Sequence, residues 1–152
     1  MKIRQASGMD AAVVGCLLHD LLAELAGVAP DKKRLDGLVE VARDLMESDA
    51  LVWGLLALDD QERALGVVML NECAATYAGG RFGEITELYV IPEQRGSGVG
   101  AGLIRAAERF AAERGWPRLE VGAPDVPRWQ ATVAFYLRSG FDEVGPRLRR
   151  VL

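Results

Sequence analysis

Hydrophobic side chains recur along the first half of the chain at helical and at strand spacing. The apolar positions of Val13–Leu25 and of Lys33–Glu47 each form one stripe, as in an amphipathic helix. The apolar runs Ala50–Leu58 and Ala64–Cys73 flank the polar connection Asp59–Arg63, which has the length of a hairpin turn. This half therefore predicts two helices followed by an antiparallel pair of strands.

The second half is expected to alternate strands with helices. The predicted elements are a strand at Glu84–Ile91, a helix from Val99 to about Arg114, a strand at Leu119–Val121, a helix at Trp129–Ser139 and a terminal strand formed by Phe141–Val144 and Arg147–Leu152. Residues 74–83 contain Gly79-Gly80 without periodicity and are expected to form a long loop. With a short strand at residues 2–6, the order is β α α β β β α β α β, an α/β (α+β) fold with a mixed sheet and helices on both faces.

Composition narrows the choice of partners. The 152 residues carry 18 basic and 22 acidic side chains, a net charge of −4 with no block of five or more like charges, so nonspecific nucleic-acid binding is not expected. No apolar run approaches the roughly 18–20 residues that span a bilayer, and no export signal is visible at the start. We expect a single domain over residues 1–152, cytoplasmic and without a membrane partner.

Cysteine and histidine are too scarce for several kinds of site. Cys16 and Cys73 lie in apolar segments and are expected to be buried, and His19 is the single histidine. A Cys/His zinc site or a triad that requires histidine is hard to build from this inventory, so no metal is expected.

The most informative segment runs from a strand through a glycine-rich turn into a helix. Gly96, Gly98 and Gly100 leave main-chain N–H groups unobstructed where a helix presents the positive end of its dipole, an arrangement that binds phosphate. The same glycines would also suit a tight turn with close packing. A P-loop is excluded because Ala101-Gly102 replaces the required Lys-Ser/Thr. A dinucleotide-binding turn would follow the first strand of its unit, whereas this turn follows the fourth predicted strand.

The sequence Arg-Gly-Ser-Gly-Val-Gly at 95–100, preceded by Leu88–Glu93, resembles the acyl-CoA-binding motif of the GNAT superfamily of N-acyltransferases. The resemblance continues through Leu119–Val121 to Ala134–Phe141 and covers roughly residues 84–144. It implies a GNAT-like domain with a mostly antiparallel central sheet, and acetyl-CoA as co-substrate.

The resemblance also implies which residues hold the cofactor. Main-chain groups of Leu88, Tyr89 and Val90 would pair with the pantetheine amides as an added strand does. Those expected to surround the pyrophosphate are Arg95, Gly96, Ser97, Gly98, Gly100 and Ala101. Trp129 stands where many relatives carry an asparagine, and its indole offers no side-chain acceptor, so that pantetheine contact does not carry over.

Three residues are the catalytic candidates. Tyr136 matches the tyrosine that, in many members, donates a proton to the departing CoA thiolate, and Glu84 and Glu87 are candidates for the base that deprotonates the amine. Strand alternation places the two glutamates on opposite faces unless a bulge intervenes. The sequence does not choose between them, and water wires can replace either.

The implied activity is transfer of an acetyl group to a primary amine, of a small molecule or a peptide, in a ternary complex. The acceptor pocket is expected from the first two helices, the 74–83 loop and the segment near Trp129. A non-catalytic acyl-CoA-binding or sensing module and a nucleotide-binding protein are the alternatives. The sequence leaves open whether the protein is a homodimer.

Overall fold

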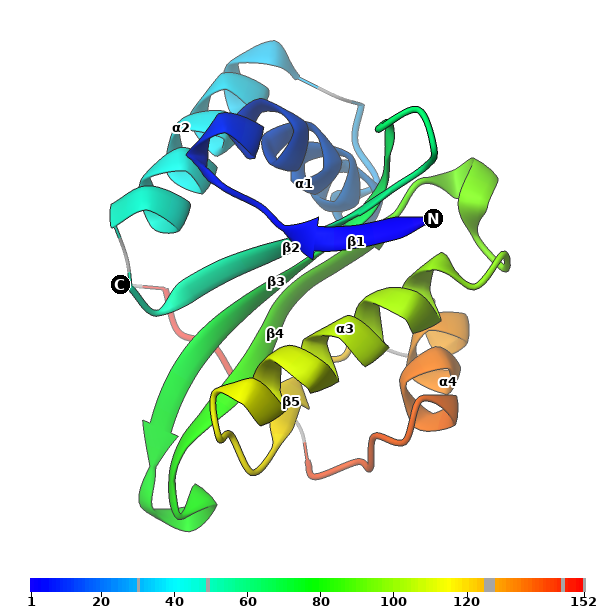
Figure 1. The fold of residues 1–152 in the computed structure, drawn as a ribbon. Coiled ribbons are helices and arrows are strands. Elements are labelled where there is room, and N and C mark those ends of the chain that lie inside the picture. Colours follow the sequence, from blue (N-terminus) through cyan, green and yellow to red (C-terminus); the bar gives the residue numbers. More distant parts are fainter. Residues whose placement is uncertain (30, 49, 125–127, 146, 152) are drawn as a thin grey trace.

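The computed structural model describes residues 1–29, 31–48, 50–124, 128–145 and 147–151. Within them, five strands form one sheet in the order β1-β2-β3-β4-β5 (Figure 1). The strands are β1 (Lys2–Gln5), β2 (Val52–Leu58), β3 (Ala64–Ala75), β4 (Gly80–Val90) and β5 (Leu119–Val121). β1, β2, β3 and β4 pair with one another in antiparallel fashion, and β5 runs parallel to β4. The predicted mixed, mostly antiparallel sheet is thus confirmed.

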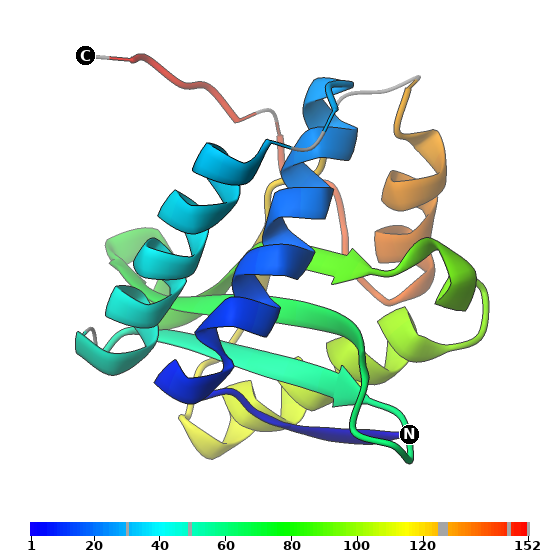
Figure 2. The same ribbon diagram turned by 90° about the horizontal axis from the view of Figure 1, so that it is seen from above.

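Helices cover both faces of the sheet. They are α1 (Ala11–Ala26), α2 (Lys32–Ser48), α3 (Val99–Glu113) and α4 (Gln130–Arg138), with three-residue 3-10 turns η1 (Gly8–Asp10), η2 (Thr76–Ala78) and η3 (Pro92–Gln94). Figure 1 shows α1 and α2 on one side of the sheet and α3 on the other, and Figure 2 shows α1 and α2 running side by side. The predicted layers are therefore present.

Alternating side chains of β2 and β3 supply a separate core to each layer. Leu56 and Val67 pack with Val14 of α1, whereas the neighbouring residues Leu55 and Val68 pack in the cluster of α3 and α4. Because both faces are buried, these strands are continuous apolar runs instead of alternating ones.

The long loop predicted at residues 74–83 is wrong. β3 continues to Ala75 and β4 begins at Gly80, so only η2 and Gly79 connect them. Gly79 and Gly80 have φ angles of +75° and +129°, which glycine adopts without strain, and they make a tight turn at the tip of a long hairpin.

The terminal strand is also absent from the described residues. Residues 141–145 and 147–151 have no regular secondary structure. Phe141 packs against the core, but Val144 and Leu148 are 88% and 92% exposed, so the apolar side chains farther along the predicted strand find no core to pack against. Cys16 is likewise exposed on α1, contrary to expectation, and Cys73 is half-buried.

Candidate active site

The glycine-rich turn presents an open helix N-terminus. Gly98 is the N-cap of α3, and Gly96 and Gly98 have φ angles of +78° and +94°, a conformation that suits glycine. No side chain caps this helix end, and a Cβ atom placed on either glycine would meet nothing within 4 Å. The first N–H groups of α3 therefore have no side-chain cap and are available to an anion.

The edge of β4 after Ile85 is open on the side where β5 pairs with the strand. Only Gly83, Glu84 and Ile85 pair with β5, and Thr86–Val90 have no strand partner there among the described residues. Ile91 N–H donates to the carbonyl of Leu65 on the β3 side at 3.0 Å. Because main-chain directions alternate along a strand, Leu88 and Val90 turn their polar groups to the open edge and Tyr89 turns its own toward β3. Two of the three predicted pairing residues thus have the required orientation.

Arg95 is held by an acid of the first helix. Its Nε donates to the Val90 carbonyl at 3.1 Å, and its Nη2 lies 2.7 and 3.0 Å from the carboxylate oxygens of Glu24. The Tyr89 hydroxyl donates to the same carboxylate at 2.9 Å. Burial works to raise the pKa of Glu24, but the contacts with Arg95 and Tyr89 outweigh it and hold that pKa below its ordinary value.

The contact between Glu24 and Arg95 was not predicted from the sequence. Glu24 lies 71 positions before Arg95, on a helix whose acids have the pattern of a solvated face. This contact forms because the fold brings Glu24 on α1 next to the residues that follow β4, and no local pattern in the sequence indicates that proximity.

A β-bulge places the two candidate bases on the same face of β4. Glu87 pairs with Met69 and Ile85 pairs with the next residue, Leu70, so Thr86 has no direct partner on β3. Met69 packs in the core beneath α1, and Asn71, which pairs with Glu84, follows it at two-residue spacing. Both glutamates therefore face the α1 and α2 side, and the expectation for an unbulged strand, opposite faces, is corrected.

The two glutamates differ in their partners. Glu84 forms an ion pair with Arg147 of the C-terminal segment, and the Cys73 thiol donates to it at 3.5 Å. Burial, together with this contact, raises the pKa of Cys73, so the thiol stays protonated. Glu87 is half-buried and forms no hydrogen bond or ion pair with a described residue, so its carboxylate is free to accept a proton.

A third acid, Glu120, lies beside Glu84. The two are direct partners in the parallel pairing of β5 with β4 and share a face of the sheet. The Tyr77 hydroxyl donates to Glu120 at 3.3 Å. This neighbour also went unrecognised in the sequence, because strand pairing decides it.

Tyr136 has a buried ring and an unpaired hydroxyl. The residue is 7% exposed, with its ring 5.4 Å from Phe135 and 5.5 Å from Phe141. Every fully buried side-chain nitrogen or oxygen of the described residues has a hydrogen-bond partner. The Tyr136 hydroxyl has no hydrogen-bond partner among the described residues, so it reaches accessible space. Burial raises the pKa of Tyr136 to about 12, which keeps the phenol neutral and able to donate.

A cavity of about 580 Å³ opens between the end of α1 and the end of β4. Its lining residues are Asp20, Ala23, Glu24, Gly27, Val28, Tyr89, Ile91, Pro92 and Glu93. The expected acceptor pocket included the first helix, which this cavity uses, but also the 74–83 segment, which lies at the far tip of the hairpin. The acidic residues of this cavity, Asp20, Glu24 and Glu93, make its lining negatively charged.

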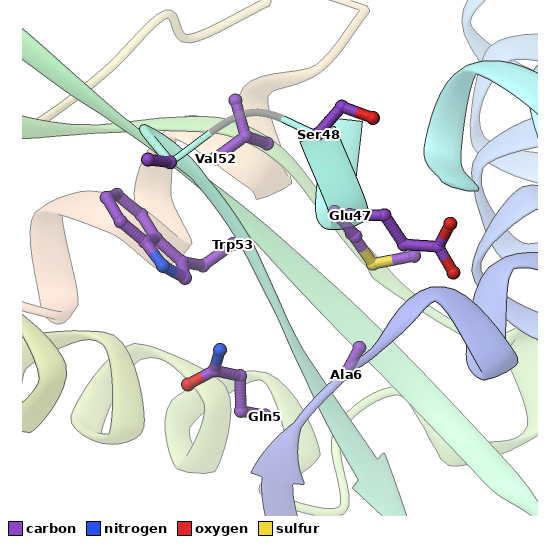
Figure 3. Close-up of a pocket in the computed structure, with 8 residues that line it drawn as sticks. Gln5, Ala6, Glu47, Ser48, Val52 and Trp53 are labelled. Carbon is purple, nitrogen blue, oxygen red and sulfur yellow. The ribbon is translucent and has the colours of Figure 1, made fainter. Parts of the chain in front are cut away.

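A smaller cavity of about 280 Å³ lies between the end of α2 and the start of β2 (Figure 3). It is lined by Gln5, Ala6, Met46, Glu47, Ser48, Ala50, Val52 and Trp53. Glu47 is the one titratable residue among the described lining residues, and Figure 3 shows its carboxylate pointing away from Trp53. These described residues include no pair of acid and base groups.

The model of the acetyltransferase (GNAT) family matches residues 18–141, which include the glycine-rich turn, the bulged strand and Tyr136. The chain belongs to the GNAT acetyltransferase family. Membership supports an acyltransferase, and GNAT proteins generally use acyl-CoA. A comparison with curated protein sequences finds no match.

Solved structures share the fold of this GNAT chain. Ribosomal-protein-alanine N-acetyltransferase from Brucella melitensis biovar Abortus 2308 is 22% identical, with a TM-score of 0.74 over 99% of this chain and 98% of its own. An aminoglycoside acetyltransferase from an uncultured soil metagenomic sample is 20% identical, with a TM-score of 0.76, and the match covers 99% of this chain and 95% of the other. A transcriptional regulator from Bacillus halodurans C-125 is 19% identical, with a TM-score of 0.82 over 99% of both chains. Likeness at this identity shows the fold alone.

Among the residues that the structure describes, no group of three or more His, Cys, Asp or Glu side chains could hold a metal ion. None of the helices in this part of the chain is long and apolar enough to cross a membrane.

Proposed function

We propose that the protein transfers an acetyl group from acetyl-CoA to a primary amine by direct attack in a ternary complex. The observation that carries this proposal is the continuity of the open edge of β4 with the free N-terminus of α3. An extended chain bearing two amides would pair with Leu88 and Val90, and a pyrophosphate would meet the N–H groups after Gly98. Acetyl-CoA supplies the thioester, the activated acyl group that this chain does not itself contain.

Tyr136 is proposed to assist departure of the thiolate. The neutral amine nitrogen bonds to the thioester carbon, the carbon–sulfur bond breaks with its electron pair on sulfur, and the proton that the nitrogen loses passes through water to the sulfur while the phenol hydrogen-bonds it. A donor with a pKa of about 12 transfers a proton uphill to a thiolate whose thiol pKa is about 8.5. The phenol therefore acts mainly by a hydrogen bond that strengthens as negative charge develops on sulfur, which is where stabilisation raises the rate.

Glu87 is the better supported of the two candidate bases. An ammonium has no lone pair, so the substrate must lose a proton before or during attack. Glu87 has no competing partner among the described residues and lies within the open edge, whereas Glu84 would first have to leave Arg147. We propose that Glu87 accepts the proton, directly or through water.

The second candidate function is an acyl-CoA-binding module without turnover. Tyr136 and Glu87 each carry a polar group with no hydrogen-bond partner among the described residues, which favours an enzyme because a binding module needs neither a donor nor a base. The acid-lined cavity further favours a cationic amine as acceptor.

Thermal unfolding and thiol release together test the proposal. Acetyl-CoA at about 100 times its Kd should stabilise the protein by about 2.7 kcal/mol, a rise in Tm of roughly 5–10 °C for a chain of this length. A panel of amines should then release CoA thiol, detected with a chromogenic disulfide. Stabilisation without release from any amine would favour the binding module. No stabilisation would contradict both functions.

A further inference from the structure

We infer that Glu24 is an intramolecular counter-ion of Arg95 and that the phosphates of acyl-CoA must displace it. Glu24 would thereby set the affinity for the cofactor from outside the glycine-rich turn. The inference rests on the proposed binding of acyl-CoA at this turn.

The contacts of Arg95 show what is already engaged. Nε is bound to the Val90 carbonyl and Nη2 to both oxygens of Glu24, while Nη1 donates to no described residue. The guanidinium also lies 5.4 Å from the centre of the Tyr89 ring. Two of its three nitrogens are thus held by the protein itself, one of them by a full negative charge.

This pairing cancels the charge that a phosphate would need. The chain has a net charge of −4 and offers no general attraction for an anion, so the positive groups next to the turn matter most. Arg95 beside Glu24 amounts to a neutral pair. A phosphate and the Glu24 carboxylate are then alternative acceptors for the same guanidinium, and bringing both close together would repel them.

Glu24 can be displaced because solvent and the Tyr89 hydroxyl can replace Arg95 as partners of its carboxylate. Its side chain is 34% exposed and that of Arg95 is 48% exposed, so solvent can reach both. The Tyr89 hydroxyl also donates to the carboxylate and can keep it on the wall of the cavity after Arg95 leaves. Arg128 does not substitute for Arg95, since it binds the main-chain carbonyl of Glu24 and not the carboxylate.

The matched variant is Glu24→Gln, which keeps the shape and the acceptor oxygen but removes the charge. Because the pair is partly exposed and screened, we expect CoA to bind about two- to fivefold more tightly, a gain that is largest at low salt and shrinks as salt screens the freed charge of Arg95. Arg95→Ala should bind CoA more weakly, and Glu24→Gln in the Arg95→Ala background should cause no further change. That epistasis is the signature of an effect that acts through Arg95.

Asp20→Asn is the control. It removes the same charge from the same helix and the same cavity, and Asp20 does not contact Arg95, so CoA affinity should stay unchanged. Calorimetric titration with CoA measures all four single and double variants, after urea unfolding has verified that each is folded.

The outcomes separate this inference from the proposed function. If the unaltered protein binds CoA but Glu24→Gln binds it no more tightly, Glu24 is not a competing counter-ion. The same conclusion follows if the gain persists without Arg95 or appears equally in Asp20→Asn. If the unaltered protein does not bind CoA, the proposed function itself fails.

Discussion

Glu84 and Glu87 have the same chemistry and the same face of β4 but different surroundings. The sequence could nominate both because carboxylates next to the predicted cofactor strand are plausible bases. It could not give their relative orientation, since the bulge at Thr86 is a property of pairing with β3. Nor could it give the partner of Glu84, because Arg147 comes from a segment that was predicted to be a strand.

The first prediction concerns the base. Glu87→Gln should lower kcat by roughly 100-fold or more, the usual worth of a positioned general base, and remove the rise of activity with pH. That rise is expected because the carboxylate must be ionised to accept a proton. Glu84→Gln should retain the profile. Profiles of kcat and kcat/KM against pH at saturating acetyl-CoA provide the measurement.

The opposite pattern, loss of the profile in Glu84→Gln alone, would move the base to Glu84. Full activity and an unaltered profile in both variants would mean that the amine loses its proton to water or arrives neutral.

Tyr136→Phe tests the proton donor. The change removes one oxygen from a residue whose ring is buried, so packing with Phe135 and Phe141 is kept. We expect kcat to fall by roughly 10- to 100-fold while CoA affinity changes little, because the hydroxyl interacts with a charge that develops only during the reaction. Calorimetry and thiol release measure the two quantities separately. Undiminished turnover with rate-limiting chemistry would exclude the role.

At the scale of elements, the predictable parts were those with a strong period or a specific turn. The helix after the glycine-rich turn begins at Val99 as expected, and β5 has the predicted bounds. The 74–83 segment was misjudged because two adjacent glycines indicate a turn without indicating its length. The terminal strand failed because an apolar pattern forms a strand only where a sheet edge and a core receive it.

The glycine-rich turn gives a prediction with a matched control. Gly98→Ala places a side chain at a φ of +94°, at a cost of about 1–2 kcal/mol. It also places a Cβ atom in front of α3. We expect CoA binding to weaken by roughly tenfold, because losing one hydrogen bond to a charged group costs about 1.5–3 kcal/mol.

Gly37→Ala is the control for that change. Gly37 lies in α2, where a Cβ atom would meet nothing within 4 Å. The substitution should stabilise the protein by about 0.5–1 kcal/mol and leave CoA binding unaltered. Equal CoA affinity in Gly98→Ala and Gly37→Ala would contradict anion binding at the turn.

At the scale of the whole molecule, the order of elements and the two helical layers followed from the sequence, but the long-range polar contacts did not. Arg95 with Glu24 and Trp116 with Glu72 each join elements distant in the chain. No local pattern specifies such pairs, because each depends on the sheet order and on helix placement.

Acid should destabilise the folded protein. Arg4 makes hydrogen bonds of 2.9 and 2.7 Å to the Asp10 carboxylate, which holds the pKa of Asp10 well below its usual value. Hydrogen bonding also lowers the pKa of Glu72, chiefly through Trp116. A carboxylate with a lowered folded pKa stabilises the protein above its unfolded pKa of about 4 and loses this contribution as the pH falls through the folded value.

Urea unfolding at pH 7, 5 and 3 measures the effect. Asp10→Asn should lower the free energy of unfolding at pH 7 by about 1 kcal/mol and make the acid loss shallower. Asp142→Asn, at an exposed site in the C-terminal segment, should change it by less than about 0.5 kcal/mol. Equal acid slopes for Asp10→Asn and the unaltered protein would remove Asp10 from this account.

The bulge in β4 makes this strand unusually tolerant of a deletion. Removing one residue from a central strand ordinarily turns every following side chain to the wrong face. Here Glu87 and Ile85 already pair with consecutive residues of β3, so a chain lacking Thr86 would keep each partner and each face and would only become a regular ladder. What it would lose is the local bend and twist where β5 stops. We therefore expect the deletion variant to unfold cooperatively near the normal midpoint yet not to bind CoA, so natural or engineered shortening at this position would separate folding from function.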